Sequence, residues 1–417
     1  MAEPSPRPIA YLTAVFPALS HTFILREIDA VEAAGVPVRP VSVREPDAQG
    51  TLGPDEQRMR GRTHYLLRTA RNPLALLAAA GWALGRPGRF LSAIGLAWSI
   101  RPAGLRALVY QLIYLVEAML LARHARAEGC GHIHSHFANS STTVAMLAAR
   151  MAGLPYSFTL HGPSDLFEAR YWRLDRKIAG ADFVACISHF ARSQAMLNAD
   201  IADWPKLRIV HCGVVPATYA GDRPPPTGDR IECIFVGRLA AVKGLPVLFE
   251  ALAAAREDQP GLHLSIVGDG PDRAMLTRLA APLGGAVTFA GALSQHQVAE
   301  ALQEADMMVL PSFAEGVPVV LMEALASGLP AIATRVAGVP ELVDHEVSGL
   351  IVAPGDVAGL RDAILRLAVD PAGRARMGQA GRERVVADYD IAREGAWLAH
   401  LFRGEAGTAL RPGKAAS

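Results

Sequence analysis

The stretch Ser312-Phe-Ala-Glu-Gly-Val-Pro-Val-Val-Leu-Met-Glu323 carries two carboxylates eight positions apart, Glu315 and Glu323. It follows an apolar run that is typical of a buried strand. Pro318 suits the first position of a helix, and Gly328 suits the residue just beyond its end, which predicts a helix of about ten residues. Carboxylates accept hydrogen bonds from neighbouring sugar hydroxyls. The alternative is a surface glutamate followed by one on a helix face, but the apolar neighbours of Glu323 indicate a carboxylate that needs a partner.

A second stretch, Gly237-Arg-Leu-Ala-Ala-Val-Lys-Gly244, begins 75 residues earlier and also follows an apolar run. Its glycines allow the backbone to approach a ligand closely. Arg238 offers a planar fork of donors that fits phosphate oxygens, and Lys243 offers a compact charge. The alternative is a solvated basic turn. Read together, the two stretches predict a site that grips a nucleotide sugar.

The start of the helix predicted after Glu315 supplies a further group of donors. Helix N-termini present free backbone amides to anions. We therefore expect the backbone of this segment to contact phosphate and sugar, together with Gly237 in the other stretch; the residues of the segment are Gly316, Val317, Pro318 and Val319.

Composition sets the limits of the fold. The chain has 417 residues, of which 51% are hydrophobic, and this length predicts two domains. Its net charge of +1 argues against a general nucleic-acid binder. Four cysteines without a Cys-x-x-Cys pair indicate free thiols in a reducing compartment. The polar N-terminus lacks the pattern of a secretory signal, so we expect a cytoplasmic protein, with the inner face of the membrane as an alternative.

Apolar strand-like runs alternate with helical segments in both halves of the chain, which predicts parallel sheets covered by helices. Pro40 demotes the run 38–43 to an edge or short strand. The proline-rich segment 214–230 reads as a linker. The predicted architecture is α/β: two doubly wound, Rossmann-like domains, 1–215 and 216–390, that face each other across a cleft, with a helix in 391–417 that returns to the first domain. Strands are expected at 8–16, 38–43, 132–135, 156–160, 183–187, 231–236, 262–267, 287–289, 307–310 and 331–334.

The segment 73–122 is rich in leucine and alanine, and arginines divide it into runs of 11 to 16 residues. A membrane crossing needs about 20 apolar residues. Packed core helices or helices that skim a membrane surface are therefore expected rather than a span.

The stretches 237–244 and 312–323, with three more motifs in the second half, resemble glycosyltransferase family 4, whose members are retaining, metal-independent enzymes of the GT-B architecture. The resemblance implies that Arg238 and Lys243 hold the donor diphosphate, that Glu315 holds the donor sugar, and that Glu323 holds the ribose. It implies no metal and no cofactor besides the nucleotide-sugar donor. The additional motifs are Gly268-Asp-Gly-Pro271, Gly338-Val-Pro-Glu341 and Gly349-Leu-Ile-Val-Ala-Pro-Gly-Asp356.

The first half resembles the exopolysaccharide branch of this family, through Phe16-Pro-Ala-Leu-Ser-His-Thr-Phe-Ile-Leu-Arg-Glu27. His161 follows the predicted strand 156–160, at the end where α/β sheets bind ligands, and the resemblance places it beside the donor sugar; the alternative is a structural histidine. Asp165 is a candidate for acceptor contact. Ser20 is another, although a helix cap is the alternative for it.

Three histidines alternate in His132-Ile-His-Ser-His136, so their side chains share one face of a predicted strand. Metal chelation, lining of a cleft and ordinary packing all remain open for them.

The predicted function is transfer of a sugar, with retention, from a nucleotide-diphosphate sugar to a saccharide or lipid-linked saccharide in cell-surface polysaccharide synthesis. Peripheral membrane contact is a further possibility, and no nucleic-acid partner is expected. The alternatives are a sugar phosphorylase or synthase of the same architecture and a nucleotide-sugar-binding protein without catalysis.

Overall fold

The computed structural model describes residues 6–18, 22–46, 53–219 and 230–411. The chain divides into two compact units, Met1–His211 with Ala392–Ser417, and Cys212–Ile391. The predicted boundaries, 215/216 and 390/391, lie four residues and one residue from these. The predicted linker 214–230 lies partly outside the described residues. Its described part belongs to the second unit, where Val214 pairs with Asp390 and Tyr219 is buried.

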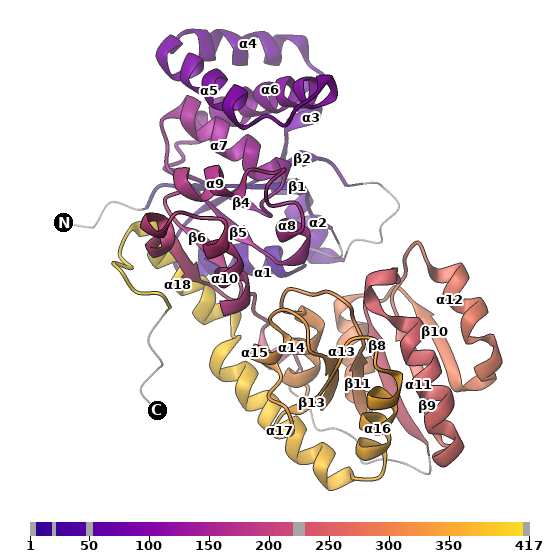
Figure 1. Ribbon diagram of the computed structural model, residues 1–417. Helices are drawn as coiled ribbons and strands as arrows, with labels where there is room; N and C mark the ends of the chain where they lie inside the picture. Colours follow the sequence, from indigo (N-terminus) through magenta and orange to yellow (C-terminus); the bar gives the residue numbers. More distant parts are fainter. Residues whose placement is uncertain (1–5, 19–21, 47–52, 220–229, 412–417) are drawn as a thin grey trace. The chain divides into compact units, whose positions relative to one another are not determined.

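The first unit is built on a seven-stranded parallel sheet in the order β3-β2-β1-β4-β5-β6-β7 (Figure 1). Its strands are β1 (Ile9–Val15), β2 (Val38–Arg44), β3 (His64–Tyr65), β4 (His132–His136), β5 (Tyr156–Leu160), β6 (Val184–Cys186) and β7 (Leu207–Ile209). Its helices are α1 (Thr22–Ala33), α2 (Pro54–Arg62), α3 (Leu66–Ala70), α4 (Pro73–Leu84), α5 (Pro87–Ile100), α6 (Leu105–Ala127), α7 (Ser140–Ala152), α8 (Pro163–Leu166), α9 (Leu174–Gly180), α10 (His189–Leu197) and α18 (Ile391–Arg403).

The second unit holds a six-stranded parallel sheet in the order β10-β9-β8-β11-β12-β13. Its strands are β8 (Ile231–Val236), β9 (Leu262–Val267), β10 (Val287–Gly291), β11 (Met307–Leu310), β12 (Ala331–Thr334) and β13 (Gly349–Val352). Its helices are α11 (Leu245–Asp258), α12 (Arg273–Ala280), α13 (Gln295–Glu304), α14 (Val319–Ala326), α15 (Val339–Leu342), α16 (Val357–Ala368) and α17 (Pro371–Asp388). Two doubly wound α/β units are therefore confirmed.

Pro40 does not place β2 at an edge, because β2 lies between β1 and β3. The proline is tolerated there because β3 is only two residues long and pairs with Val41 and Ser42 alone. The prediction of an edge or short strand was wrong, since β2 has seven residues and lies inside the sheet, although Pro40 does lie outside the pairing with β3. Strands β3, β7 and β13 were not predicted.

The core of the first unit joins both ends of the chain. Strand β1 and helix α1 contribute Tyr11 and Ile28, and helix α18 contributes Trp397, Leu398 and Leu401 to the same buried cluster. The Trp397 indole donates to the carbonyl oxygen of Ile209 at 3.0 Å. The last helix is thus an integral part of the first unit.

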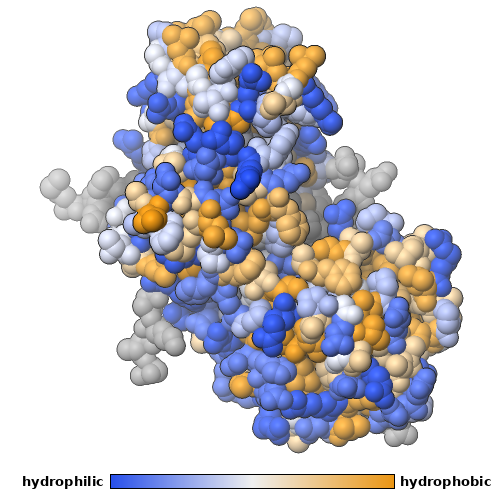
Figure 2. Space-filling view, viewed as in Figure 1, coloured by the Kyte–Doolittle hydropathy of each residue, from blue (hydrophilic) through white to orange (hydrophobic). Residues whose placement is uncertain are grey.

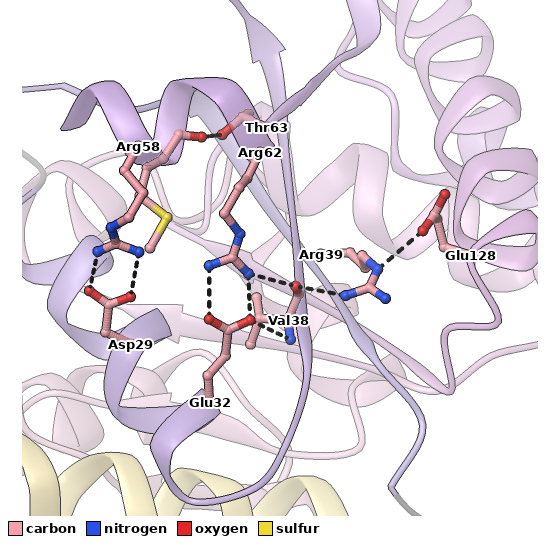
Figure 3. Close-up of polar contacts among 9 residues, drawn as sticks. Asp29, Glu32, Val38, Arg39, Arg58, Arg62, Thr63 and Glu128 are labelled. Carbon is pink, nitrogen blue, oxygen red and sulfur yellow. Dashed lines mark hydrogen bonds and ion pairs between the residues drawn. The ribbon is translucent and has the colours of Figure 1, made fainter. Parts of the chain in front are cut away.

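Helix α2 is fastened to α1 by two bidentate ion pairs (Figure 3). Arg58 donates to both carboxylate oxygens of Asp29, at 3.1 and 2.7 Å, and Arg62 donates to both of Glu32, at 2.9 and 2.5 Å. Because these side chains are roughly one-quarter to two-fifths exposed, each pair contributes about 1 kcal/mol or less.

Helices α4, α5 and α6 form a separate layer beyond α7, at the top of Figure 1. Within the described residues, α6 is the one helix long and apolar enough to cross a membrane, although 39% of its most apolar window is buried. This differs from the predicted short runs, because α6 continues for 23 residues and includes Arg106 and Arg123.

Candidate functional site

The order of strands in the second unit reverses between β8 and β11. From β8 the chain proceeds outward to β9 and β10, whereas from β11 it proceeds to β12 and β13 on the other side. In open α/β sheets, such a reversal leaves a crevice at the carboxyl ends of the two central strands, and ligands bind there. The stretches 237–244 and 312–323 leave β8 and β11 at this end.

The two loops are joined through their backbones. The amide of Phe313 donates to the carbonyl oxygen of Val242 at 2.8 Å. Gly244 has φ +67°, and a Cβ at this position would lie 2.1 Å from the carbonyl oxygen of Pro311. Glycine is therefore required for the loops to pack this closely. Their contact fixes the position of Lys243 relative to the loop that carries Glu315.

Lys243 and Glu315 form a close ion pair as a result. Lys243 Nζ lies 2.6 Å from Glu315 Oε1, and the two side chains are 19% and 10% exposed. The hydroxyl of Ser312 also donates to Oε1, at 2.6 Å. Ser312 is itself buried, and its carbonyl oxygen accepts from the hydroxyl of Thr334. The carboxylate is thus held by two donors. Ser312 was not predicted, although a hydroxyl three residues before a loop carboxylate is a signal for this contact.

Arg238 is exposed and makes no hydrogen bond or ion pair among the described residues, so its guanidinium is available to a ligand. Its turn is held by the Gly-Asp-Gly-Pro motif that follows β9. The amide of Leu239 donates to the carbonyl oxygen of Asp269 at 3.0 Å. A Cβ on Gly268 would lie 1.9 Å from the Gly237 carbonyl oxygen, and one on Gly270 would lie 2.3 Å from that of Leu239. These glycines serve close backbone packing beneath Arg238.

Helix α14 is shorter than predicted. Pro318 is its N-cap, with φ −67° and ψ 120°, and the helix has eight residues rather than about ten. The prediction that Pro318 occupies the first helical position was wrong, because its ψ is extended. Gly328 adopts φ +69° just beyond the C-cap, as expected.

The donors at the start of α14 are fewer than predicted. Pro318 has no amide hydrogen, and the amides of Leu321 and Met322 donate to its carbonyl oxygen. The predicted backbone segment therefore offers the amides of Gly316, Val317 and Val319. The Gly316 carbonyl oxygen accepts from the amide of Gly338 at 3.0 Å, which ties this loop to the start of α15.

Glu323 is 8% exposed, on the inward side of α14. Its Oε1 accepts a hydrogen bond from the hydroxyl of Tyr219 at 2.9 Å. The buried carboxylate thus has the partner that its apolar surroundings demand. Tyr219 was not predicted, because it lies 104 positions away in sequence.

In the first unit, His161 follows β5 and is partly buried. Its Nε2 lies 2.8 Å from Nδ1 of His136, and Nε2 of His136 lies 3.4 Å from Glu27 Oε1. The hydroxyl of Tyr11 donates to the same oxygen at 2.5 Å. Burial raises the pKa of Glu27 to about 7, although the Tyr11 hydrogen bond opposes the rise. A row of buried titratable groups therefore ends at His161; Glu27 and Tyr11 in this row were not predicted.

The other two histidines of β4 are core residues. His132 Nε2 and His134 Nδ1 both lie 2.7 Å from the hydroxyl of Ser157, and His134 Nε2 lies 2.9 Å from that of Thr159. Burial lowers the pKa of His132 to about 3 and that of His134 well below its usual value. Among the alternatives for this run, packing fits these two.

Glu27, His134 and His136 each offer one ligand atom, and these atoms lie within 4.8 Å of one another. Both ring nitrogens of His134 already contact hydroxyl groups, however, so a metal ion there would have to displace those hydrogen bonds. This donor set does not fit a metal well.

Asp165 has a different task from the acceptor contact predicted for it. It is 1% exposed, and its two carboxylate oxygens accept from the amides of Ala138 and His161, both at 2.9 Å. Burial raises its pKa to about 6. Lys177, also fully buried, donates to the carbonyl oxygens of Ala138 and Asn139, both at 2.8 Å. Asp165 therefore positions the backbone of His161 and cannot reach solvent.

Ser20 lies outside the described residues. The neighbouring Thr22 begins α1.

Comparison with known families adds an independent line of evidence. Residues 222–384 match the family model described as glycosyl transferases group 1, and residues 57–218 match the model described as glycosyltransferase family 4. The first match lies within the second unit, and the other covers the first unit from residue 57 and extends to residue 218, just beyond His211.

The chain is similar to curated proteins of bacterial polysaccharide synthesis. It is 29% identical over 286 residues to the teichuronic acid biosynthesis glycosyltransferase TuaC of Bacillus subtilis, covering 65% of this chain and 70% of that protein. It is 31% identical over 193 residues to the amylovoran biosynthesis glycosyltransferase AmsK of Erwinia amylovora, covering 44% of this chain and 47% of that protein. The chain thus spans about half the length of AmsK.

A solved structure shares the fold. Anabaena Alr3699/HepE, crystallised in complex with UDP-glucose, superposes with a TM-score of 0.71 at 16% sequence identity, over 95% of this chain and all of that chain.

Proposed function

The chain belongs to the glycosyltransferases that the group 1 and family 4 models describe, and from this premise we propose that it is a retaining, metal-independent hexosyltransferase. Its donor is a nucleotide-diphosphate sugar, and its acceptor is a hydroxyl of a saccharide or lipid-linked saccharide in cell-surface polysaccharide synthesis. The names of TuaC and AmsK support the polysaccharide setting. Because the HepE structure contains UDP-glucose, UDP-sugars are the first donors to test.

The observation that carries the proposal is the constellation at the reversal between β8 and β11. A free guanidinium, an ammonium, an oriented carboxylate and a helix start lie on loops that leave the same end of the sheet. The cations suit a diphosphate, and the carboxylate suits sugar hydroxyls. Glu323, oriented by Tyr219, is assigned to the ribose.

In the reaction, the bond between the anomeric carbon and the diphosphate oxygen breaks, and its electron pair stays on that oxygen. Arg238, Lys243 and the amides before α14 stabilise this growing negative charge. Such preorganised donors are worth about 3 kcal/mol of barrier each. Glu315 keeps the hydroxyls of the donor sugar in place while the charge develops.

We assign retention of the anomeric configuration to attack by the acceptor oxygen on the face of the sugar from which the leaving group departs. The acceptor oxygen forms the new bond to the anomeric carbon, and its proton passes to the departing phosphate. Glu315 is committed to Lys243 and Ser312, so it is not assigned as a nucleophile. His161 is assigned to the donor sugar, with its ring held by His136 and its backbone by Asp165.

The test first screens UDP-sugars for those that raise the melting temperature of the protein. Sugar transfer from these donors is then measured for the Arg238→Ala variant. A ligand at one hundred times its Kd stabilises the fold by about 2.7 kcal/mol, which is a clear shift in melting temperature. We expect the variant to lose transfer about 100-fold or more and to melt as the wild type does, because Arg238 is exposed and makes no hydrogen bond or ion pair with any described residue. Unchanged turnover would refute the assignment. Release of a sugar phosphate that depends on inorganic phosphate would show a phosphorylase instead.

A further inference from the structure

The outer face of the α4–α6 layer is unusually apolar. Twelve of the 23 large hydrophobic side chains that are exposed among the described residues fall between Leu74 and Val116. Figure 2 shows orange side chains gathered over this layer, with blue groups among them. The twelve are Leu74, Leu77, Leu84, Leu91, Ile94, Trp98, Leu105, Val109, Tyr110, Leu112, Ile113 and Val116.

The side of α4 and α5 that faces the protein carries smaller residues. The buried residues of α4 are Ala79 and Ala83, and α5 buries Ala93 and Ala97 with Ile100. A helix on the surface of a globular protein normally turns its large apolar residues inward. Here alanines pack inward while leucines and a tryptophan point outward, with Leu77 68% and Trp98 62% exposed. An apolar surface of this extent marks an interaction site.

The charge of the layer has a single sign. From Leu66 to Ala127 the sequence contains eight arginines, no lysine and one acid, Glu117, which is buried. Two arginines lie over exposed aromatic rings: the guanidinium carbon of Arg101 is 4.1 Å from the Trp98 ring centre, and that of Arg106 is 5.6 Å from the Tyr110 ring centre.

A hollow at one end of the layer is lined by arginines. Its lining residues are Trp82, Arg86, Arg89, Arg123, Arg126 and Ala127. Arg89 and Arg126 also donate to the carbonyl oxygen of Ala152 at the end of α7, so they hold the layer to the domain. Arg123 makes no hydrogen bond or ion pair with any described residue. Four guanidinium groups around one hollow form a site for an anion such as a phosphate.

We propose that the α4–α6 layer docks on the surface of an anionic phospholipid bilayer. Its leucines and tryptophan enter the boundary between headgroups and acyl chains, and the arginine hollow binds headgroup phosphates. The charge selects this occupant over a second copy of the chain. In a symmetric dimer, the same patch meets itself, and the arginines of each copy would then face arginines.

The layer lies on the membrane and does not cross it. The buried side of α6, which includes Gln111, Glu117 and Leu121, packs against the domain, with α7 as its main neighbour. A crossing helix would have to leave this packing and expose a glutamate to lipid. This inference concerns a different surface from the proposed transfer site and does not depend on it.

The experiment measures co-sedimentation of the full chain with vesicles of phosphatidylglycerol and, separately, of phosphatidylcholine. The apolar variant is Leu77→Ser/Trp98→Ser/Leu112→Ser; its control is Leu197→Ser/Ile201→Ser, which removes apolar side chains that are 77% and 75% exposed elsewhere on the same unit. The charge variant is Arg86→Glu/Arg123→Glu, outside the contacts to Ala152. Its control is Arg278→Glu/Arg376→Glu, which changes the net charge equally at two exposed positions of the second unit.

The wild type is expected to bind phosphatidylglycerol vesicles much more tightly than phosphatidylcholine vesicles, and added salt should weaken that binding. The apolar and charge variants should each lose about tenfold or more in partition, and both controls should behave as the wild type does. Absence of binding to phosphatidylglycerol, or equal binding by all variants, would overturn the proposal. So would sedimentation velocity showing that the apolar variant converts a dimer to a monomer without change in vesicle binding.

Discussion

Replacement of Lys243 by methionine is the sharpest test of the site in the second unit. The change removes the ammonium and keeps most of the apolar stem. Glu315 would then keep only the hydroxyl of Ser312 as a donor to Oε1. The substitution thus removes the cation assigned to the diphosphate and one of the two groups that hold the carboxylate.

The structure gives separate magnitudes for stability and catalysis. The Lys243 and Glu315 side chains are 19% and 10% exposed, between a surface pair, worth up to about 1 kcal/mol, and a fully buried one, whose breakage costs about 3–5 kcal/mol. Because Ser312 stays in place, we expect a loss of about 1–2 kcal/mol in the free energy of unfolding. We expect the transfer rate at saturating donor to fall about 100- to 1,000-fold, because a preorganised donor to the leaving group is lost.

The assay pairs urea unfolding with initial rates of transfer, and Arg366→Met serves as the control. Arg366 forms an ion pair with Glu346 in the same unit, but both side chains are about half exposed, so its removal should leave the free energy of unfolding and the transfer rate close to their wild-type values. The double variant Lys243→Met/Glu315→Gln should lose no more activity than the worse single variant, because groups that act as a unit are not additive. Turnover of Lys243→Met within threefold of the wild type would contradict the reasoning.

Three further predictions follow from other parts of the structure. The pKa of Glu27 is about 7 when the protein is folded and near 4.5 when it is unfolded, so the folded state binds more protons between these pH values, and the free energy of unfolding falls by up to about 3 kcal/mol as the pH rises through them. Urea unfolding of Glu27→Gln at pH 5 and pH 7.5 should lack this difference. The same pH dependence in the variant as in the wild type would disprove the prediction. Gly268→Ala places a Cβ 1.9 Å from the Gly237 carbonyl oxygen at φ +135°, so the free energy of unfolding should drop by about 3 kcal/mol, whereas Gly61→Ala, with open space in α2, should not destabilise the protein. Transfer should continue in excess EDTA, because the cationic side chains supply the charge that a metal would otherwise provide; loss of activity that Mg²⁺ or Mn²⁺ restores would argue against metal independence.

The sequence is sufficient to predict the sheet where strands are continuous apolar runs. Strand β11 has the predicted bounds, because a buried parallel strand carries apolar residues on both faces. Strands β5 and β8 also have the predicted bounds, although Ser157, Thr159 and Glu232 interrupt their apolar runs. β3 and β7 escape prediction because they are only two and three residues long, so a hydrophobic run cannot reveal them. Pro40 misleads for the opposite reason. Proline does lie where no neighbouring strand needs its amide, but whether the whole strand is an edge strand depends on how far the neighbouring strand extends.

The residues of the candidate site also differ in how well the sequence predicts them. Loop residues that follow strands, such as Lys243 and Glu315, can be predicted because the topology alone brings strand ends together. Partners that arrive from distant segments, such as Tyr219 on Glu323, leave no local pattern. Asp165 shows that a local pattern can also predict the wrong role. Its place after β5 resembles that of a ligand-binding residue, and only the amides that it accepts from reveal a structural role.

Each unit has a point where its strand order reverses, but the ionisable groups at these two points differ in their burial. At the reversal between β1 and β4, Glu27, His132 and His134 are buried, and burial raises the pKa of Glu27 and lowers the pKa of each of the two histidines, which favours their neutral forms. At the reversal between β8 and β11, Arg238 is exposed and Lys243 is partly exposed. A leaving diphosphate gathers negative charge, which the proposed reaction balances with cationic side chains. The glycines at 244 and 268 support this arrangement, because they let the loops pack closely without burying the cations that we assign to the diphosphate.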